Sequence, residues 1–201
     1  MEVFAIPTSE ILSLGRGPMK YAWQSESRHV DDEGGEEVAK WLFLLSKGSP
    51  HSIDMLFAPI EADWAAQCDP ETLSRAHVMR GIGMDALSRK PVQEGVIGYA
   101  MNSFRKIKER PGKWKGAMLR VLYQGQELVY SGTLSNGLAV PEDGWGNTVR
   151  RALRDEMTEG EALDIANRLI AEIRAAPSVL PDEPDWNGIN GWLLDLRREL
   201  W

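Results

Sequence analysis

Residues 92–132, VQEGVIGYAMNSFRKIKERPGKWKGAMLRVLYQGQELVYSG, decide the fold. Apolar residues recur at helical spacing over residues 92–109, and most of the charged residues lie off that stripe. Pro111-Gly112 interrupts the pattern, and a second helix begins near Lys113. Because only a short loop separates the two segments, we expect them to form an antiparallel helical hairpin.

Capping residues predict where further helices begin. Ser49 is placed to cap a helix whose first turn accepts Pro50, because the missing N–H of proline would have no partner there. Thr158 and Glu161 have the spacing of a capping box. Residues 131–148, rich in Gly, Ser, Asn and Pro, indicate a loop. The expected further helices cover residues 38–47, 50–58, 70–80, 158–176 and 186–200.

The start of the chain carries weaker strand signals. VFAIP at residues 3–7 and the segment Met19–Gln24 are short and β-prone, with a Gly-Pro turn between them. The sequence therefore predicts an α+β fold that is predominantly helical. A small N-terminal β element would be followed by a helical bundle, with domains at residues 1–60 and 61–201.

Composition excludes several classes of protein. The chain has 201 residues, a single cysteine and a net charge of −7. One cysteine excludes an internal disulfide framework and a Cys-rich zinc site, and the three histidines are far apart in sequence. No apolar run approaches the ~20 residues of a membrane span, and no secretory signal is visible. We therefore expect a cytoplasmic protein that does not enter a membrane.

Positive charge is concentrated in one part of the chain. Residues 91–130 carry seven Lys and Arg against three Asp and Glu, although the whole chain is acidic. One interpretation is a phosphate-binding surface, since Lys and Arg neutralise phosphate charge. The other is a solvated helix face whose cations pair with acidic neighbours. The candidate phosphate-binding residues are Lys106, Lys113, Lys115 and Arg120, with Lys47 and His51 near the helix start at Ser49 as further candidates.

A second cluster is acidic. Asp31, Asp32, Glu33, Glu36 and Glu37 crowd one short stretch before the first predicted helix. Carboxylates are favoured at a helix N-terminus by the helix dipole. They are also the hard oxygen ligands that Mg²⁺ requires in phosphoryl and nucleotidyl transfer. Both interpretations stay open on the sequence alone.

Four segments resemble a known family in the right order. They are KWLFLLSKGSPHSIDMLFAP at 40–59, Gly98-Tyr99-Ala100, KWKGAMLRVLYQGQELVYSG at 113–132 and SVLPDEPD at 178–185. Together they resemble polymerase-beta-type nucleotidyltransferases associated with RNA repair in bacteria and phages, over about residues 3–200. The resemblance implies that residues 1–60 hold a partial nucleotidyltransferase sheet. It also implies transfer of a nucleotide from an NTP to an RNA or other hydroxyl acceptor, with Mg²⁺.

The chain departs from that family at the metal site. The Gly-Ser turn and the Asp-x-Asp strand of the family have no counterpart before residue 3, and Asp31 or Asp32 is the nearest match to the remaining catalytic, metal-holding carboxylate. Gly48-Ser49 followed by Glu61-Ala62-Asp63 fits the pattern formally, but Ser49 is expected to cap a helix. We therefore expect the isolated chain to be an incomplete or inactive nucleotidyltransferase.

A non-catalytic role is the alternative. A phage-type binding or inhibitory protein would act on a host protein or a nucleic acid. Trp23, Trp64, Trp145 and Trp186 stand in polar contexts and would serve either as interface anchors or as core residues. An open edge of the expected sheet would favour pairing with another chain, so a homo- or hetero-oligomer is a further expectation.

Overall fold

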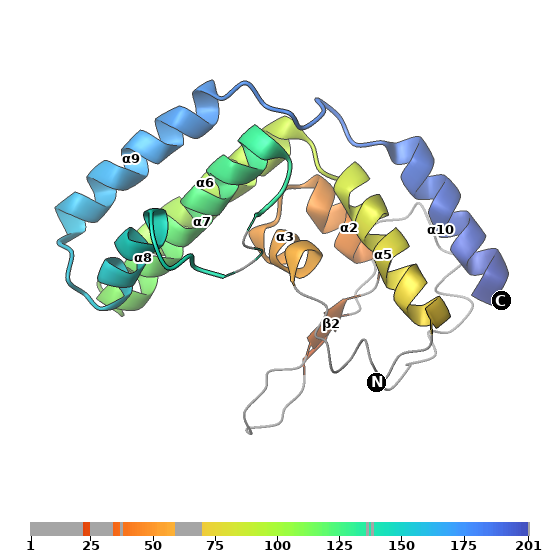
Figure 1. Cartoon of the computed structure of the whole chain (residues 1–201), viewed down its shortest axis with the longest axis horizontal. Helices are drawn as coiled ribbons and strands as arrows, with labels where there is room; N and C mark the ends of the chain where they lie inside the picture. Colours follow the sequence, from red (N-terminus) through yellow and green to blue (C-terminus); the bar gives the residue numbers. More distant parts are fainter. Residues whose placement is uncertain are drawn as a thin grey trace. The chain divides into compact units, whose positions relative to one another are not determined.

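The computed structural model describes residues 22–24, 34–36, 38–58, 70–135, 137 and 139–200 of the chain. It divides into two compact units, Met1–Phe43 and Leu44–Trp201, and the packing described below belongs to the second. The helices in the described residues (Figure 1) are α2 (Val38–Ser46), α3 (Pro50–Phe57), α5 (Pro70–Asp85), α6 (Arg89–Arg105), α7 (Pro111–Ser131), α8 (Trp145–Leu153), α9 (Glu159–Ala175) and α10 (Trp186–Leu200).

The expected α+β class is wrong, because the described chain folds as helices. Strand pairing there is limited to a three-residue antiparallel ladder between β1 (Ala22–Gln24) and β2 (Gly34–Glu36). A two-stranded ladder of this size has no sheet face to cover and is marginal in stability. Of the two expected strands, residues 3–7 and 19–21 lie outside the described residues, and the described part of the second strand is β1.

The α6–α7 hairpin that the sequence predicts is confirmed. Pro111 is the first residue of α7, as its missing N–H allows. The helix ends at Gly132, whose φ of 73° lets its N–H donate to the Leu128 carbonyl. The two helices approach closely at Gly125, where a Cβ atom would lie 2.4 Å from a methyl carbon of Val96. Glycine at this position therefore sets the spacing of the hairpin.

Helix α8, which the sequence analysis assigned in part to a loop, packs against the start of α7. Two glycines one turn apart make this contact. A Cβ on Gly112 would lie 2.4 Å from the backbone oxygen of Leu153, and one on Gly116 would lie 2.3 Å from a methyl carbon of the same leucine. The end of α8 therefore lies directly on the backbone of α7.

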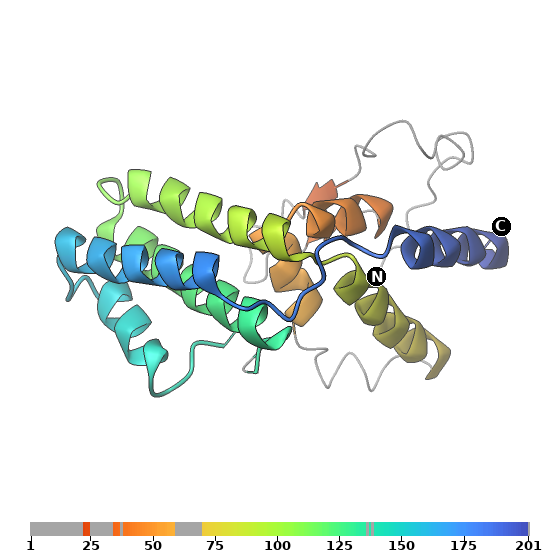
Figure 2. The same cartoon turned by 90° about the horizontal axis from the view of Figure 1, so that it is seen from above.

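Helix α9 completes the bundle beside α6 and α7 (Figure 2). The predicted capping box at its start is confirmed, because the Thr158 side chain accepts from the Glu161 N–H while the Glu161 side chain accepts from the Thr158 N–H. The Gln93 side chain donates to the Ile173 carbonyl at 2.7 Å and joins α6 to α9. Fully buried side chains of these three helices include Val92, Ala100, Met118, Leu119, Leu122, Leu169 and Ile173.

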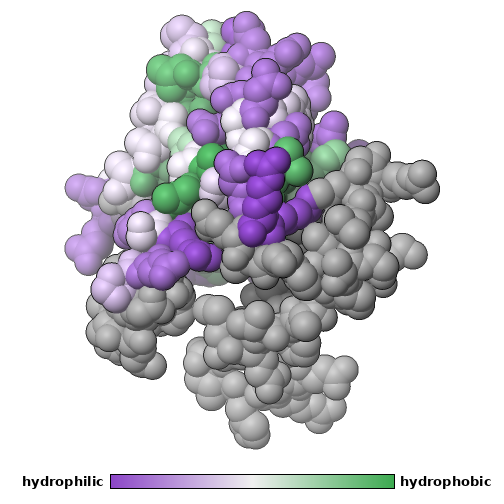
Figure 3. Space-filling model, turned by 90° about the vertical axis from the view of Figure 1, so that its right-hand side faces the viewer, coloured by the Kyte–Doolittle hydropathy of each residue, from purple (hydrophilic) through white to green (hydrophobic). Residues whose placement is uncertain are grey.

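Helix α10 lies against α5 and buries Ile189 and Leu193. The connection from α9 is held by backbone hydrogen bonds from Arg89 to Pro181 and from Asp185 to Asp85. Figure 3 shows the side of the molecule that lies at the right in Figure 1. Among its coloured residues, hydrophobic residues are interspersed with hydrophilic ones. In the part of the chain that the structure describes, we find no helix with the length and hydropathy of a bilayer-spanning segment.

Candidate functional site

Among the residues that the structure describes, positive charge is concentrated where α6 turns into α7. We call residues Arg105–Lys113 the basic turn. Its backbone is ordered by hydrogen bonds from the Lys106 N–H to Ser103, from Ile107 to Phe104 and from Glu109 to Lys106. The Ile107 side chain is buried and anchors the turn to the bundle. The loop is therefore a fixed platform for its charged side chains.

The basic turn contains five cations and one acidic residue, Glu109. Four of the cations are exposed and Lys106 is half-buried. Within the described residues, no ion pair engages any of the five. The positive N-terminal end of α7 and the negative C-terminal end of α6 both lie here, so the two helix dipoles oppose each other and the side chains set the sign of the field. The cations are Arg105, Lys106, Lys108, Arg110 and Lys113.

Trp114 orders two of these cations. The Lys106 ammonium lies 4.9 Å from the centroid of the Trp114 ring, and the Lys113 ammonium lies 5.1 Å from it. Both are cation–π distances, at which the ring attracts the charge without neutralising it. Two of the predicted phosphate-binding lysines, Lys106 and Lys113, are therefore brought together at one aromatic ring, with their charge intact.

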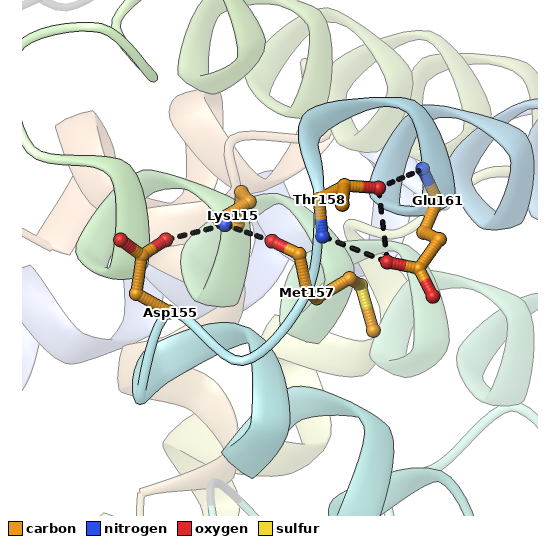
Figure 4. Close-up of polar contacts among 5 residues, drawn as sticks. All are labelled: Lys115, Asp155, Met157, Thr158 and Glu161. Atoms are coloured by element: carbon orange, nitrogen blue, oxygen red, sulfur yellow. Dashed lines mark hydrogen bonds and ion pairs between the residues drawn. The ribbon is translucent and has the colours of Figure 1, made fainter.

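Lys115 is turned into the protein instead. Only 3% of the residue is exposed, although it carries a charge. Its ammonium donates to Asp155 at 2.5 Å and to the backbone oxygen of Met157 (Figure 4). Asp155 has a φ of 61°, a left-handed conformation that Asp tolerates better than most residues. These two bonds use two of the three ammonium N–H groups and tie α7 to the loop between α8 and α9.

An open pocket of about 680 Å³ lies between the basic turn and that loop. Ile107, Lys108 and Pro111 line one side, and residues 155–159 line the other, with Lys115 between them. The pocket lining therefore combines apolar side chains with two ammonium groups and three carboxylates, those of Asp155, Glu156 and Glu159.

The start of α9 borders this pocket and fixes one more carboxylate. Hydrogen bonds from the Thr158 backbone and side chain hold the pKa of Glu161 below its ordinary value. The carboxylate of Glu161 therefore stays ionised to a lower pH than that of an ordinary glutamate.

Arg120, Lys47 and His51 lie away from the basic turn. Arg120 donates to Asp54 at 3.2 Å and links α7 to α3. Burial raises the pKa of Asp54, against the opposing effects of Arg120 and His51. His51 is exposed in the first turn of α3, and Lys47 is exposed just after α2. The structure thus brings Lys106 and Lys113 together, whereas Arg120 forms an ion pair with Asp54.

The two predicted metal-binding residues, Asp31 and Asp32, lie outside the described residues, as do Glu61 and Asp63. Ser49 caps α3, as the sequence predicts, by accepting from the Ser52 N–H. Among the residues that the structure describes, no three His, Cys, Asp or Glu side chains are grouped as metal ligands.

The chain was also compared with known proteins. No family model, curated protein or solved structure matches it. The resemblance to nucleotidyltransferases therefore stays a prediction. The residues that sequence reasoning missed are Asp155 and Met157, which meet Lys115 from 40 and 42 positions along the chain. One signal was available, because Lys115 precedes the buried Met118 and Leu119 by three and four residues and so shares their face.

Proposed function

We propose that this chain is a non-catalytic nucleic-acid-binding protein whose basic turn contacts the phosphate backbone. The observation that carries the proposal is the set of five cations in the basic turn without an ion-pair partner among the described residues. Unpaired positive charge concentrated on an ordered loop of an acidic protein favours the binding of a polyanion at that loop.

The alternative interpretation of this charge is a solvated face whose cations pair with acidic neighbours. Ion pairs do occur elsewhere on the chain, for example between Arg89 and Asp182 and between Arg120 and Asp54. The other cations of α6 and α7 each have a carboxylate partner, and the five within the basic turn do not; these paired cations are Arg89, Lys90, Lys115 and Arg120. This contrast favours an external partner over internal pairing.

The test is binding of a fluorescently labelled 20-nucleotide RNA or DNA strand, followed by anisotropy. The variant Lys108→Gln/Arg110→Gln/Lys113→Gln removes three exposed cations of the basic turn. We expect binding to weaken roughly tenfold or more at 0.1 M salt. A phosphate that no longer contacts a cation keeps its counterions, so fewer counterions are released on binding. The slope of log K against log[salt] should fall by about 2, since each single-strand phosphate contact contributes about 0.7.

A matched control removes the same total charge elsewhere. Lys90→Gln/Arg168→Gln/Arg198→Gln changes three exposed cations that each pair with a nearby carboxylate on their own helix. Binding by this variant should stay within about threefold of the wild type, and equal losses in the two triple variants would contradict a specific role for the basic turn.

Two further measurements separate the other candidate roles. A polyglutamate of matched charge that displaces the strand as well as unlabelled nucleic acid would indicate an acidic protein partner instead. Covalent transfer of a labelled nucleotide to RNA in the presence of Mg²⁺ would contradict the non-catalytic part of the proposal.

A further inference from the structure

We propose that the pocket beside the basic turn receives one unpaired base, so that the nucleic acid bound is a single strand and the base is selected by its amino group. This inference rests on the proposed function and specifies its substrate. The pocket and the basic turn share part of their surface. Lys108 and Pro111 belong to both the basic turn and the pocket lining, so a phosphate held on the turn brings its own nucleotide to the pocket mouth.

The size and the apolar part of the lining suit a planar ring. The pocket is open to solvent, and its volume of about 680 Å³ leaves room for a nucleobase with its sugar. Pro111 is exposed and offers apolar surface to the pocket, and the buried side chains of Ile107 and Met157 support its two sides from beneath. These walls are fixed, because Lys115 ties the Met157 backbone to α7 (Figure 4).

The charges of the lining exclude a phosphate from the pocket itself. Three carboxylates, of Asp155, Glu156 and Glu159, outnumber the two ammonium groups of Lys108 and Lys115. Carboxylates accept hydrogen bonds from amino groups of bases, as they do from the cytosine amino group in DNA recognition. The basic turn and the acidic pocket thus match the two ends of a nucleotide, an anionic phosphate and a base that donates hydrogen bonds.

A base inside a duplex cannot occupy the pocket without leaving its partner and its stack, which opposes binding. The bases of a single strand are already unpaired, so this cost of unpairing does not arise. Proteins that bind single strands commonly combine a basic groove for the backbone with a surface for the bases. We therefore expect a 12-nucleotide single strand to bind at least fivefold more tightly than a 12-base-pair duplex at the same salt concentration.

Cytosine and uracil give the sharpest test of the carboxylates. The two rings have nearly the same shape, but cytosine carries an amino group where uracil carries a carbonyl. Oligocytidine should bind at least threefold more tightly than oligouridine at pH 7.5, in line with one additional hydrogen bond to a charged acceptor. Equal binding of the two strands would overturn the role of the carboxylates.

Two variants at one position separate the space in the pocket from its charge. Glu156→Trp fills the pocket with a large ring, whereas Glu156→Ala removes the same charge and leaves the space open. Glu156 is exposed and lies in the loop between α8 and α9, so circular dichroism should report the same helix content for both. Because both variants lose one negative charge, their effects on phosphate attraction cancel.

The readouts are the ratio of single-strand to duplex affinity and the ratio of oligocytidine to oligouridine affinity. Glu156→Trp should abolish the preference for single strands, and Glu156→Ala should retain that preference while reducing the cytidine preference. An unchanged single-strand preference in Glu156→Trp would overturn the inference. A second contrary result would be equal binding of strand and duplex by the wild type, together with weaker binding by the triple variant of the basic turn. That result would overturn the inference about the pocket and would leave the proposed function intact. Binding to no nucleic acid at all would instead overturn both.

Discussion

Replacing Asp155 with Asn tests how the buried ammonium of Lys115 is held. The residue is 3% exposed and its ammonium lies 2.5 Å from the Asp155 carboxylate. Removing one partner of a fully buried ion pair costs about 3–5 kcal/mol. Because 56% of the Asp155 side chain is exposed, solvent screens this pair, and we expect a loss of ~2 kcal/mol in the free energy of unfolding. Asn tolerates the φ of 61° and keeps a carbonyl acceptor, so the loss reports charge rather than backbone strain.

Urea unfolding at pH 7, followed by far-UV circular dichroism, measures this loss in two backgrounds. The second background is Lys115→Met, which keeps a side chain of similar length without a charge. There the Asp155→Asn change should cost less than ~0.5 kcal/mol, and the difference between the backgrounds is the coupling of the pair. In thermal melts, a loss of ~2 kcal/mol corresponds to a drop of about 4–8 °C in Tm for a chain of this size.

An equal cost of Asp155→Asn in both backgrounds would refute the reasoning, because the carboxylate would then act independently of the ammonium. Glu94→Gln is the matched control, since Glu94 pairs with Lys90 at 3.9 Å and both side chains are largely exposed. That change should alter the free energy of unfolding by less than ~0.5 kcal/mol.

Three further predictions concern packing and pH. Gly112→Ala should lower the free energy of unfolding by about 1–3 kcal/mol in thermal melts, because its Cβ meets the backbone of Leu153; Gly116→Ala should cost less, since it meets the movable end of that half-exposed side chain. The pKa of Glu161 is lowered in the folded state, so its contribution is present above its ordinary pKa of about 4.5 and is lost as the pH falls. Urea midpoints of Glu161→Gln between pH 3 and 7 should therefore vary less than those of the wild type. Burial raises the pKa of Asp54, so ionisation of this carboxyl group lowers the free energy of unfolding as the pH rises. Urea unfolding at pH 7 should therefore find Asp54→Asn at least as stable as the wild type.

Local signals predicted much of the helical structure. The Ser49-Pro50 start of α3 and the Thr158-Glu161 start of α9 follow from hydrogen bonds within three residues, and such bonds are visible in the sequence. Helix α8 was missed because Gly146 and Asn147 stand in its first turn and continue a run of loop residues. Its position depends on packing against the glycines of α7, a contact between distant segments.

The candidate site was predictable only in part, for the same physical reason. Lys106 and Lys113 stand close in sequence, and the turn between two helices necessarily brings them together. Lys115 looked like a third member because its charge suggests exposure, but its position on the buried face of α7 carries it inward. Its partner Asp155 is 40 residues away, at a distance where neither periodicity nor spacing identifies a contact.

The contacts of Gly112 and Lys115 also limit how this chain can vary. Leu153 is fixed against α7 at one end of the loop, and the Thr158 cap begins α9 at the other. The four residues between them must place two acceptors, the Asp155 carboxylate and the Met157 carbonyl, within hydrogen-bond distance of the Lys115 ammonium. An insertion or deletion here would shift both acceptors at once, so natural variants should exchange side chains in this loop but preserve its length.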